Sequence, residues 1–298
     1  MEAPDCKLFE IFKDSFSDFF DQAAKSQQDK KINLTEDKLA KMTGSAVAAL
    51  SGTNENELRE LKRQLEKRNI KIGRYINNGA TAYVFELLDK HGKIIEPTVL
   101  RIEIGSASAD IQSSVARWPI MKIDLKNGNP EHDNDICFRA TIVPRAYHAK
   151  DEELEFENED ILRTFAMLNQ EGNLEKATDI NLSQIMRLKN PDGSYVHYKE
   201  FPDKAVGIII DQNCLSGITQ MGGVDSFCKD KEINYNEVKE RKASQDEIDY
   251  VKGQLADIYR HAVEELLKRD VQLQDAPTLQ QNANVEALTN PRDRFLIT

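Results

Sequence analysis

The segment Ile208-Ile209-Ile210-Asp211 is an apolar run that ends in a single acid, and the interpretation of the whole chain starts from it. Upstream, Thr178-Asp179-Ile180-Asn181-Leu182-Ser183-Gln184 places an acid five residues ahead of a carboxamide and leads into the apolar Ile185-Met186. Both segments therefore predict a buried strand with polar side chains next to it. Two carboxylates and an amide in this setting can hold divalent cations such as Mg²⁺ and can orient a hydroxyl group.

The overall composition excludes several classes of protein. A chain of 298 residues can form one large domain or two modest ones, and its 40% hydrophobic and 31% charged content is typical of soluble globular proteins. The formal net charge of -11 argues against a general nucleic-acid binder, which needs a basic surface. The four cysteines have no metal-ligand spacing, so a reducing, cytosolic setting is expected; they are Cys6, Cys137, Cys214 and Cys228.

No targeting or membrane-spanning segment is predicted. The longest apolar runs, such as 206–210, are far too short to cross a bilayer. The first residues, Met1 to Cys6, lack the basic start and the apolar stretch of a secretory signal.

Residues 1–69 are predicted to form a helical extension. Second and third helices are expected at 35–42 and 55–68, the latter opened by the capping-box pair Asn54 and Glu57. We expect the apolar stripe of the first helix to pack on the same protein, and docking on a partner or a membrane is the alternative. This stripe has helical spacing and consists of Leu8, Phe9, Phe12, Phe16, Phe19 and Phe20.

From Ile70 onward the pattern becomes that of β-strands joined by tight turns at Gly79 and Gly92. The first three strands in sequence are expected to form an antiparallel meander. A short helix is expected at 106–116. The predicted strands are 70–72, 82–88, 98–104 and 136–143.

The second half of the chain mixes helices and strands. The turn Asn190-Pro191-Asp192-Gly193 predicts a hairpin. Ser244 and Glu247 form a capping box that opens a long amphipathic helix reaching Leu266. Residues 271–298 are polar and are expected to be a tail or linker. The other predicted elements are the helix 159–168, the hairpin strands 184–189 and 194–201, and the buried strand 206–211.

With the predicted strands and helices in this order, residues 70–215 resemble the protein-kinase superfamily. Ile76-Asn77-Asn78-Gly79-Ala80-Thr81-Ala82-Tyr83-Val84 aligns without gaps with the glycine-rich loop, although only one of the three glycines is present. In Val99-Leu100-Arg101, an arginine replaces the lysine of the third strand. The resemblance implies that the nucleotide-binding residues are Asn78, Gly79, Val84 and Arg101.

The two segments quoted first match the remaining kinase motifs. Asp179 and Gln184 have the spacing of the catalytic loop, which implies that Asp179 accepts the substrate hydroxyl proton and that Gln184 replaces the metal-binding asparagine. Asp211-Gln212-Asn213 takes the place of Asp-Phe-Gly, which makes Asp211 a ligand of Mg²⁺ or Mn²⁺. Ala177-Thr178 replaces the usual His-Arg pair.

The resemblance also suggests a partner for Arg101, a second catalytic candidate. In kinases that partner is a glutamate on the following helix, where this chain offers Asp110. Glu103 lies two residues after Arg101 and therefore on the same face of the predicted strand, so it can pair with Arg101 directly.

The resemblance implies an α+β, two-lobed, protein-kinase-like fold. A small antiparallel-sheet lobe is expected at 70–150 and a reduced helical lobe at 151–270. They would lie between the helical extension 1–69 and the polar tail 271–298.

A basic run stands out in this acidic chain, and it can be a solvated helix face or a polyanion-binding site. The chain as a whole resembles atypical effector kinases of intracellular pathogens, including a Legionella type that host inositol hexakisphosphate activates. The resemblance implies this small-molecule activator, a protein substrate, and delivery into the host cytosol without a Sec-type signal peptide. The run consists of Lys62, Arg63, Lys67, Arg68, Lys71 and Arg74.

Three functions are compatible with these residues. The first is an atypical protein kinase that transfers phosphoryl groups from ATP to Ser or Thr hydroxyls with the help of Mg²⁺ or Mn²⁺. The second keeps the fold but binds ATP in reverse and transfers AMP. The third is a pseudokinase or adaptor without catalysis, which the replacements Arg101, Gln184 and Gln212 favour.

Overall fold

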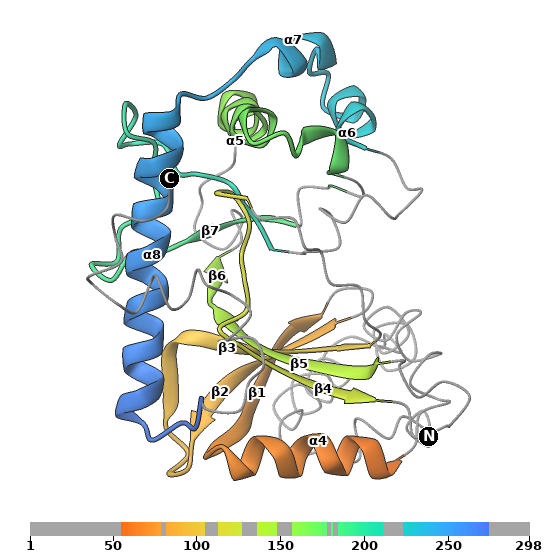
Figure 1. Ribbon diagram of the computed structural model, residues 1–298, viewed down its shortest axis with the longest axis vertical. Helices are drawn as coiled ribbons and strands as arrows, with labels where there is room; N and C mark the ends of the chain where they lie inside the picture. Colours follow the sequence, from red (N-terminus) through yellow and green to blue (C-terminus); the bar gives the residue numbers. More distant parts are fainter. Residues whose placement is uncertain are drawn as a thin grey trace, which may run out of the picture. The chain divides into compact units, whose positions relative to one another are not determined.

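The computed structural model divides the chain into two compact units, each described here by itself (Figure 1). The first unit comprises Met1–Ser106, Pro119–Val143 and Val263–Ala283. The second comprises Ala107–Trp118, Pro144–Ala262 and Asn284–Thr298. Within them, the structure describes residues 55–78, 82–104, 113–126, 136–147, 157–177, 180, 184–210 and 223–273.

The first unit is built on a β-sheet with the strand order β1-β2-β3-β5-β4. The pairs β1–β2, β2–β3 and β4–β5 are antiparallel. The strands are β1 (Ile70–Asn78), β2 (Ala82–Asp89), β3 (Ile94–Ile104), β4 (Met121–Lys126) and β5 (Ile136–Pro144).

Alternation along β2 places a row of buried aromatic side chains on one face of this sheet. In β2, Tyr83 and Phe85 are buried at 1% exposure or less, and they alternate with the half-buried Val84. Helix α4 (Glu55–Lys67) contacts β1 and β4, and its Leu61 and Leu65 are fully buried one helical turn apart. Burial of these side chains supplies the hydrophobic free energy of the unit.

A turn after β2 is fixed by the buried carboxylate of Asp89. Its Oδ1 atom accepts the backbone N–H groups of His91 at 2.8 Å and Lys93 at 2.9 Å, and its Oδ2 atom accepts from Arg269 at 3.3 Å. These donors, the Lys93 N–H foremost, hold the pKa of Asp89 below its usual value. Gly92 has a φ of +79°, a conformation that glycine adopts without strain.

The second unit combines short strands with several helices. The strands β6 (Ala146–Tyr147), β7 (Ile185–Leu188) and β8 (Ile208–Ile209) pair in sequence order, both pairs antiparallel. Phe165 and Phe227 of two different helices pack edge to face, with ring centroids 5.5 Å apart. The helices are α5 (Asn158–Gln170), α6 (Val224–Asp230), α7 (Tyr235–Glu240) and α8 (Gln245–Lys268), with a 3-10 turn at Leu174–Lys176.

Most of the predicted elements are present. The α+β class with an antiparallel sheet is confirmed, as are the helices at 55–68 and 159–168 and the long helix that follows Ser244. The Ser244 hydroxyl accepts the Glu247 N–H at 3.2 Å, as the capping box predicted. The apolar stripe of residues 8–20 and the helix at 35–42 lie outside the described residues.

Other predictions were incomplete or wrong. Strand β4 was not predicted, and neither were α6 and α7. The described part of the expected helix 106–116 is not helical, because Ala116 forms a parallel bridge with Ile209 instead. The expected strand 194–201 is reduced to isolated bridges, because the chain turns back where Lys204 N–H bonds to Phe201 O at 3.0 Å.

The start of the expected polar tail is packed rather than solvated. Val271 and Leu273 are 2% and 6% exposed, and the N–H of Gln272 donates to the Arg68 carbonyl at 3.1 Å. The proposed domain boundaries at 69/70, 150/151 and 270/271 stay predictions.

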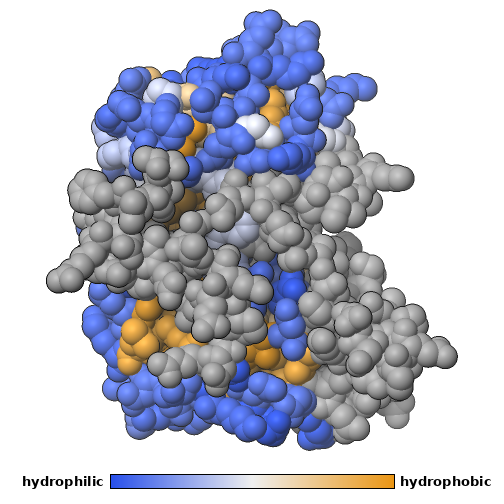
Figure 2. Space-filling model, in the orientation of Figure 1, coloured by the Kyte–Doolittle hydropathy of each residue, from blue (hydrophilic) through white to orange (hydrophobic). Residues whose placement is uncertain are grey.

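On the face that Figure 2 shows, the described residues at the top of the view, where α6 and α7 lie, are mostly hydrophilic. Among the described helices, none has the length and apolar character needed to cross a membrane.

Replacing Asp89 by Asn tests the carboxylate turn. Because its pKa is lower in the folded than in the unfolded state, the charge stabilises the fold above the unfolded pKa, and this contribution is lost as the pH falls through the folded pKa. We expect Asp89→Asn to be less stable than the wild type at neutral pH and to lose less stability on acidification. Urea unfolding at neutral pH and at about pH 3 measures both effects. An equal loss on acidification in the two proteins would contradict the assignment.

Candidate functional site

The nucleotide-binding candidates of the first unit come from neighbouring strands. Val84 of β2 lies opposite Asn77 of β1 on one side and opposite Arg101 of β3 on the other. Asn78 lies opposite Tyr83, next to this row. The structure therefore brings Asn78, Val84 and Arg101 to the same part of the meander. Gly79 lies outside the described residues.

Arg101 forms an ion pair with Glu103 on the same strand, which confirms that prediction. Both side chains are 11% exposed, and they lie on the face of β3 opposite the fully buried Leu100 and Ile102. An ion pair with so little solvent exposure is costly to break by removing one partner. Glu103 is thus a partner of Arg101 on the same strand. Asp110, the alternative partner, lies outside the described residues.

In the second unit, the segments carrying the two predicted metal ligands lie side by side. The N–H of Ile210 donates to the backbone carbonyl of Gln184 at 2.9 Å, and Ile185 pairs with Ile209 in the antiparallel register of β7 and β8. Gln184 and the residue before Asp211 therefore lie at the same end of two paired strands. Asp211 itself lies outside the described residues.

The entry into β8 is sterically constrained. A Cβ atom on Gly207 would meet Cγ2 of Ile185 at 2.7 Å and Oγ1 of Thr164 at 2.8 Å. Only glycine fits there without a shift of the neighbours, because such distances are shorter than a carbon contact allows. The close packing fixes the position of β8 against β7 and α5.

The predicted catalytic Asp179 also lies outside the described residues, but its flanking residues are anchored. Ala177 and Ile180 are 1% and 6% exposed and belong to the core of the second unit. The N–H of Ala177 donates to the carbonyl of Leu174 at 3.2 Å and closes the 3-10 turn.

The predicted ligands have the chemistry that Mg²⁺ and Mn²⁺ require. Carboxylate and amide oxygens are the hard donors that these ions prefer. Among the described residues there is no cluster of three or more His, Cys, Asp or Glu side chains.

The basic run of α4 and β1 is partly neutralised. Arg63 bonds to Glu60, Arg68 to Gln64, and Arg74 to Glu86 of β2 at 2.9 Å. The three lysines of the run, Lys62, Lys67 and Lys71, have exposed side chains. Arg63 and Arg74 are exposed as well, at 52% and 60%, but their charges are paired with carboxylates.

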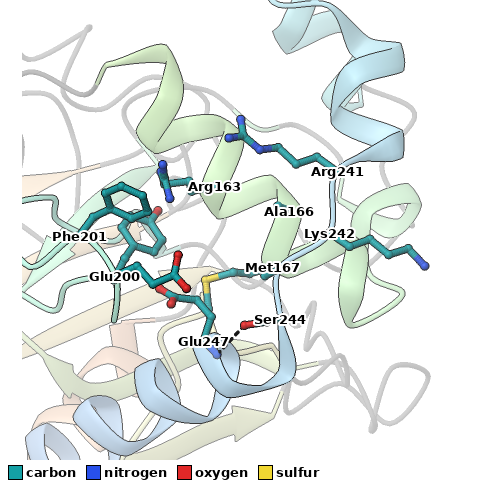
Figure 3. Close-up of a pocket in the computed structure, with 11 residues that line it drawn as sticks. Arg163, Ala166, Met167, Glu200, Phe201, Arg241, Lys242, Ser244 and Glu247 are labelled. Atoms are coloured by element: carbon teal, nitrogen blue, oxygen red, sulfur yellow. Dashed lines mark hydrogen bonds between the residues drawn. The ribbon is translucent and has the colours of Figure 1, made fainter.

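Sequence reasoning missed an open cavity of about 210 Å³ in the second unit (Figure 3). Its lining includes Met167 and Phe201 as well as charged side chains of both signs, among them Arg163, Glu200 and Glu247. The Arg163 guanidinium stacks on the Phe201 ring, 3.6 Å from its centroid. This balance of charges indicates no particular ligand.

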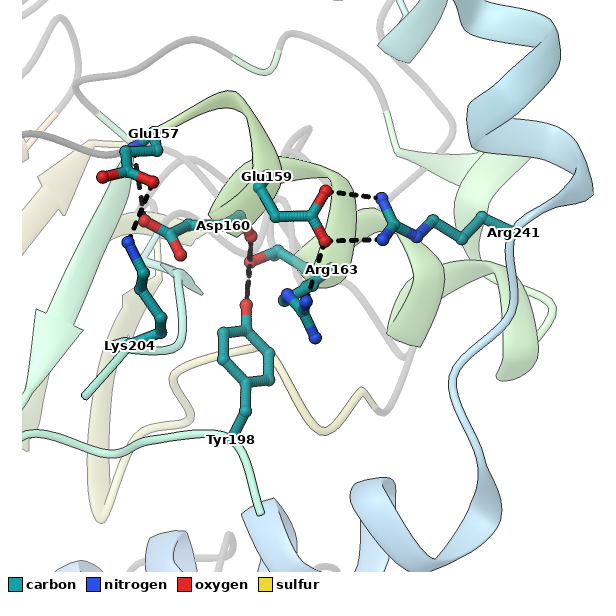
Figure 4. A network of polar contacts seen from close by, with 8 residues as sticks. Glu157, Glu159, Asp160, Arg163, Tyr198, Lys204 and Arg241 are labelled. Atoms are coloured by element: carbon teal, nitrogen blue, oxygen red, sulfur yellow. Dashed lines mark hydrogen bonds and ion pairs between the residues drawn. The ribbon is translucent and has the colours of Figure 1, made fainter. Parts of the chain in front are cut away.

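An ion-pair network beside the cavity joins α5 to the segment before α8 (Figure 4). Glu159 accepts two hydrogen bonds from Arg241, at 2.9 and 2.5 Å, and pairs with Arg163 at 2.9 Å. The Arg241 bonds above all hold the pKa of Glu159 below its usual value. Sequence alone could not indicate this network, because the two partners are 82 residues apart.

A second group of contacts in Figure 4 fixes the segment 198–204 to α5. The buried Tyr198 hydroxyl donates to the Asp160 carbonyl at 3.0 Å, and Lys204 pairs with Glu157 at 2.8 Å. Burial raises the pKa of the Asp160 carboxyl, although one of its oxygens accepts the Glu157 N–H. Glu157 and Asp160 form a capping box at the start of α5. The sequence predictions did not include this helix cap.

Comparisons with known proteins give similarity to solved structures alone. No protein-family model matches the chain, and no curated protein matches it. Among solved structures, the chain is similar to a MAP kinase from Leishmania major, with 12% sequence identity over 82% of this chain and 89% of that one, at a TM-score of 0.31.

A double-mutant cycle measures the strength of the Glu159–Arg241 pair. The side chains are 41% and 31% exposed, so we expect a coupling free energy of about 1 kcal/mol or less at neutral pH. Because the pKa of Glu159 is lowered in the fold, the coupling should vanish as the pH falls through that pKa. Urea unfolding of wild type, Glu159→Gln, Arg241→Gln and the double variant gives the value. A coupling that does not fall at all on acidification would contradict the ion-pair assignment.

Proposed function

We propose that this chain is an atypical, ATP- and metal-dependent protein kinase. The observation that carries the proposal is the 2.9 Å hydrogen bond from Ile210 N–H to the Gln184 carbonyl. It joins two segments that are far apart in sequence and that both resemble metal-binding kinase motifs. In the first unit, the nearness of Asn78, Val84 and Arg101 on neighbouring strands supports the same interpretation.

Each proposed residue has a definite task in phosphoryl transfer. Kinase catalysis consists mainly of positioning and electrostatic stabilisation. Asp211 and Gln184 would hold Mg²⁺ or Mn²⁺, which neutralises charge on the ATP phosphates. Asp179 would orient a Ser or Thr hydroxyl of the protein substrate and accept its proton.

Arg101 would contact the nucleotide phosphates in place of the usual lysine. A guanidinium presents a planar set of donors and keeps its charge, so it can bind phosphate while it remains paired with Glu103. In kinases the strand cation pairs with a glutamate of the next helix; here Glu103 of the same strand pairs with it. Arg101 also keeps AMP transfer as the second candidate function, because a guanidinium replaces the lysine ammonium that would meet the phosphates. A pseudokinase or adaptor is the outcome if neither transfer occurs.

A polyanionic activator is part of the proposal. The exposed Lys62, Lys67 and Lys71 offer positive charge for a multiply phosphorylated ligand such as host inositol hexakisphosphate. This would make the protein an effector kinase that works in the cytosol of a host cell. Calorimetric titration of the full chain with inositol hexakisphosphate, with Lys62→Gln/Lys67→Gln/Lys71→Gln as comparison, tests the activator separately from the transfer reaction.

Removing the proposed metal ligand or the proposed base should abolish transfer. With radiolabelled ATP, Mg²⁺ or Mn²⁺ and host-cell extract, we expect Asp179→Asn to lower the rate about 10²- to 10⁴-fold, because the hydroxyl loses its proton acceptor. Asp211→Asn should also lose activity, because the metal loses its charged ligand. Thermal unfolding of both variants should match the wild type.

Asp203→Asn is the matched control, since Asp203 is an exposed carboxylate on a turn and belongs to none of the kinase-like motifs. It should retain full activity. Mass spectrometry of the labelled product distinguishes phosphate from adenylate. If Asp179→Asn and Asp211→Asn both transfer phosphate at the wild-type rate, the proposed function is wrong.

A further inference from the structure

The cavity of the second unit has a size that suits a single side chain. Its volume of about 210 Å³ exceeds the roughly 150 Å³ that holds a benzene ring. It is smaller than the sites of about 300–1,000 Å³ that take drug-sized molecules. A group the size of one amino-acid side chain therefore fits better than a nucleotide or another large metabolite.

The walls of this cavity are fixed to one another by hydrogen bonds. On one side, the Ala243 N–H donates to the Ala166 carbonyl of α5 at 3.1 Å. On another side, the Tyr198 hydroxyl donates to the Asp160 carbonyl of the same helix at 3.0 Å. Because its walls are already in place, the cavity loses little conformational entropy when a ligand binds.

The lining contains charges of both signs, but they differ in what they are already bonded to. Arg163 and Arg241 both form ion pairs with Glu159, and the Arg163 guanidinium also covers a face of Phe201. Lys242 points away from the other labelled side chains in Figure 3. The basic groups of the lining are therefore directed to partners or away from the cavity.

The two carboxylates of the lining, Glu200 and Glu247, keep unused acceptor capacity. Within the described part of the chain, neither forms an ion pair or accepts a hydrogen bond from another side chain. Oε1 of Glu247 accepts the Lys199 N–H at 2.9 Å, which places this carboxylate next to the backbone that carries Glu200. Figure 3 shows both carboxylates turned to the part of the cavity where the Met167 thioether lies. A cation that carries several donors would satisfy this pair.

The rest of the lining is apolar and suits an aliphatic chain. It is formed by Ala166, Met167, Ala243 and the ring of Phe201. Lysine and arginine side chains pack their stems on such surfaces and leave the charged head to polar groups. Arginine fits two carboxylates better than lysine does, because its planar guanidinium presents five donors.

We propose that this cavity binds an arginine side chain of a protein partner. The stem lies against Met167, and the guanidinium donates to Glu200 and Glu247. None of the residues in the kinase-like motifs lines the cavity, so the proposal goes beyond the proposed function and does not depend on it. A chain without transferase activity can still bind the arginine.

Methyl NMR of the full chain, labelled with ¹³C-methyl methionine, tests the proposal. The Met167 signal is identified by its absence in Met167→Leu, and it reports on the cavity directly. The probe is the acetylated and amidated peptide Gly-Gly-Arg-Gly-Gly, and the comparison peptide carries citrulline, which has nearly the same shape without the charge.

We expect the arginine peptide alone to shift the Met167 signal, with a Kd of about 1 mM, as suits one partly exposed anchor. The absence of a shift up to about 10 mM peptide would overturn the proposal. An equal response to the citrulline peptide would overturn it too, because the carboxylates would then contribute nothing.

Variants of the two carboxylates separate this site from a general attraction of cations to a protein with a net charge of -11. Glu200→Gln and Glu247→Gln each remove one charge and keep an acceptor oxygen, so the Lys199 N–H keeps its partner. We expect each variant to weaken binding about 3- to 10-fold. Glu175→Gln is the matched control, since Glu175 is an exposed carboxylate of the same unit that does not line the cavity.

The control should bind the peptide as the wild type does. Wild-type affinity in both Glu200→Gln and Glu247→Gln would refute the assignment, and so would an equal loss in Glu175→Gln. If Glu247→Gln does not fold, Glu200→Gln decides alone, because Glu200 is exposed and its replacement leaves the fold intact.

Discussion

The second unit depends on the backbone hydrogen bonds of β8. This strand has only two residues, yet it pairs with β7 on one side and with residues 115–117 on the other. Ile208 and Ile209 are 0% and 1% exposed, so the unpaired peptide groups of a lone strand would be buried without partners. Pairing on both sides removes that cost and fixes the point at which the chain leaves the core.

In the first unit, a mostly buried ion pair lies on a strand of the β-sheet. β2 and β3 direct Phe85, Leu100 and Ile102 to one face and leave the other face to Arg101 and Glu103. The apolar face provides the stability, and the ion pair on the other face satisfies two charges that are mostly removed from solvent. A strand can carry both because its side chains alternate.

Sequence patterns predicted the elements whose signals are local. Helix α8 begins at a Ser244 cap and has a regular apolar face, and the Arg101–Glu103 pair follows from strand geometry alone. The helix expected at 106–116 is not formed in its described part. The expectation rested on local helix propensity, whereas Val115 and Arg117 pair with Ile209, more than ninety residues away.

The same reason explains what the sequence did not reveal at the candidate site. The kinase-like motifs located Gln184 and Asp211, but the bond from Ile210 to Gln184 depends on how two strands meet. Arg117 and Glu159 belong to no motif, and their partners lie far along the chain. Strand β4 is a separate case, because its alternation of Met121, Ile123 and Leu125 with polar residues was visible in the sequence.

The Tyr259 hydroxyl accepts the Trp118 N–H at 2.5 Å and donates to the Trp118 carbonyl at 2.8 Å, and this clamp has a practical consequence. Trp118 is the single tryptophan of the chain, so the intrinsic fluorescence excited at the red edge of protein absorption comes from one indole. That indole is half-buried and packs against the core of the second unit. Trp118 directly follows residues 115–117, which pair with β8. Its emission is therefore a built-in optical probe of this segment, which needs no label and responds to any ligand that alters its surroundings.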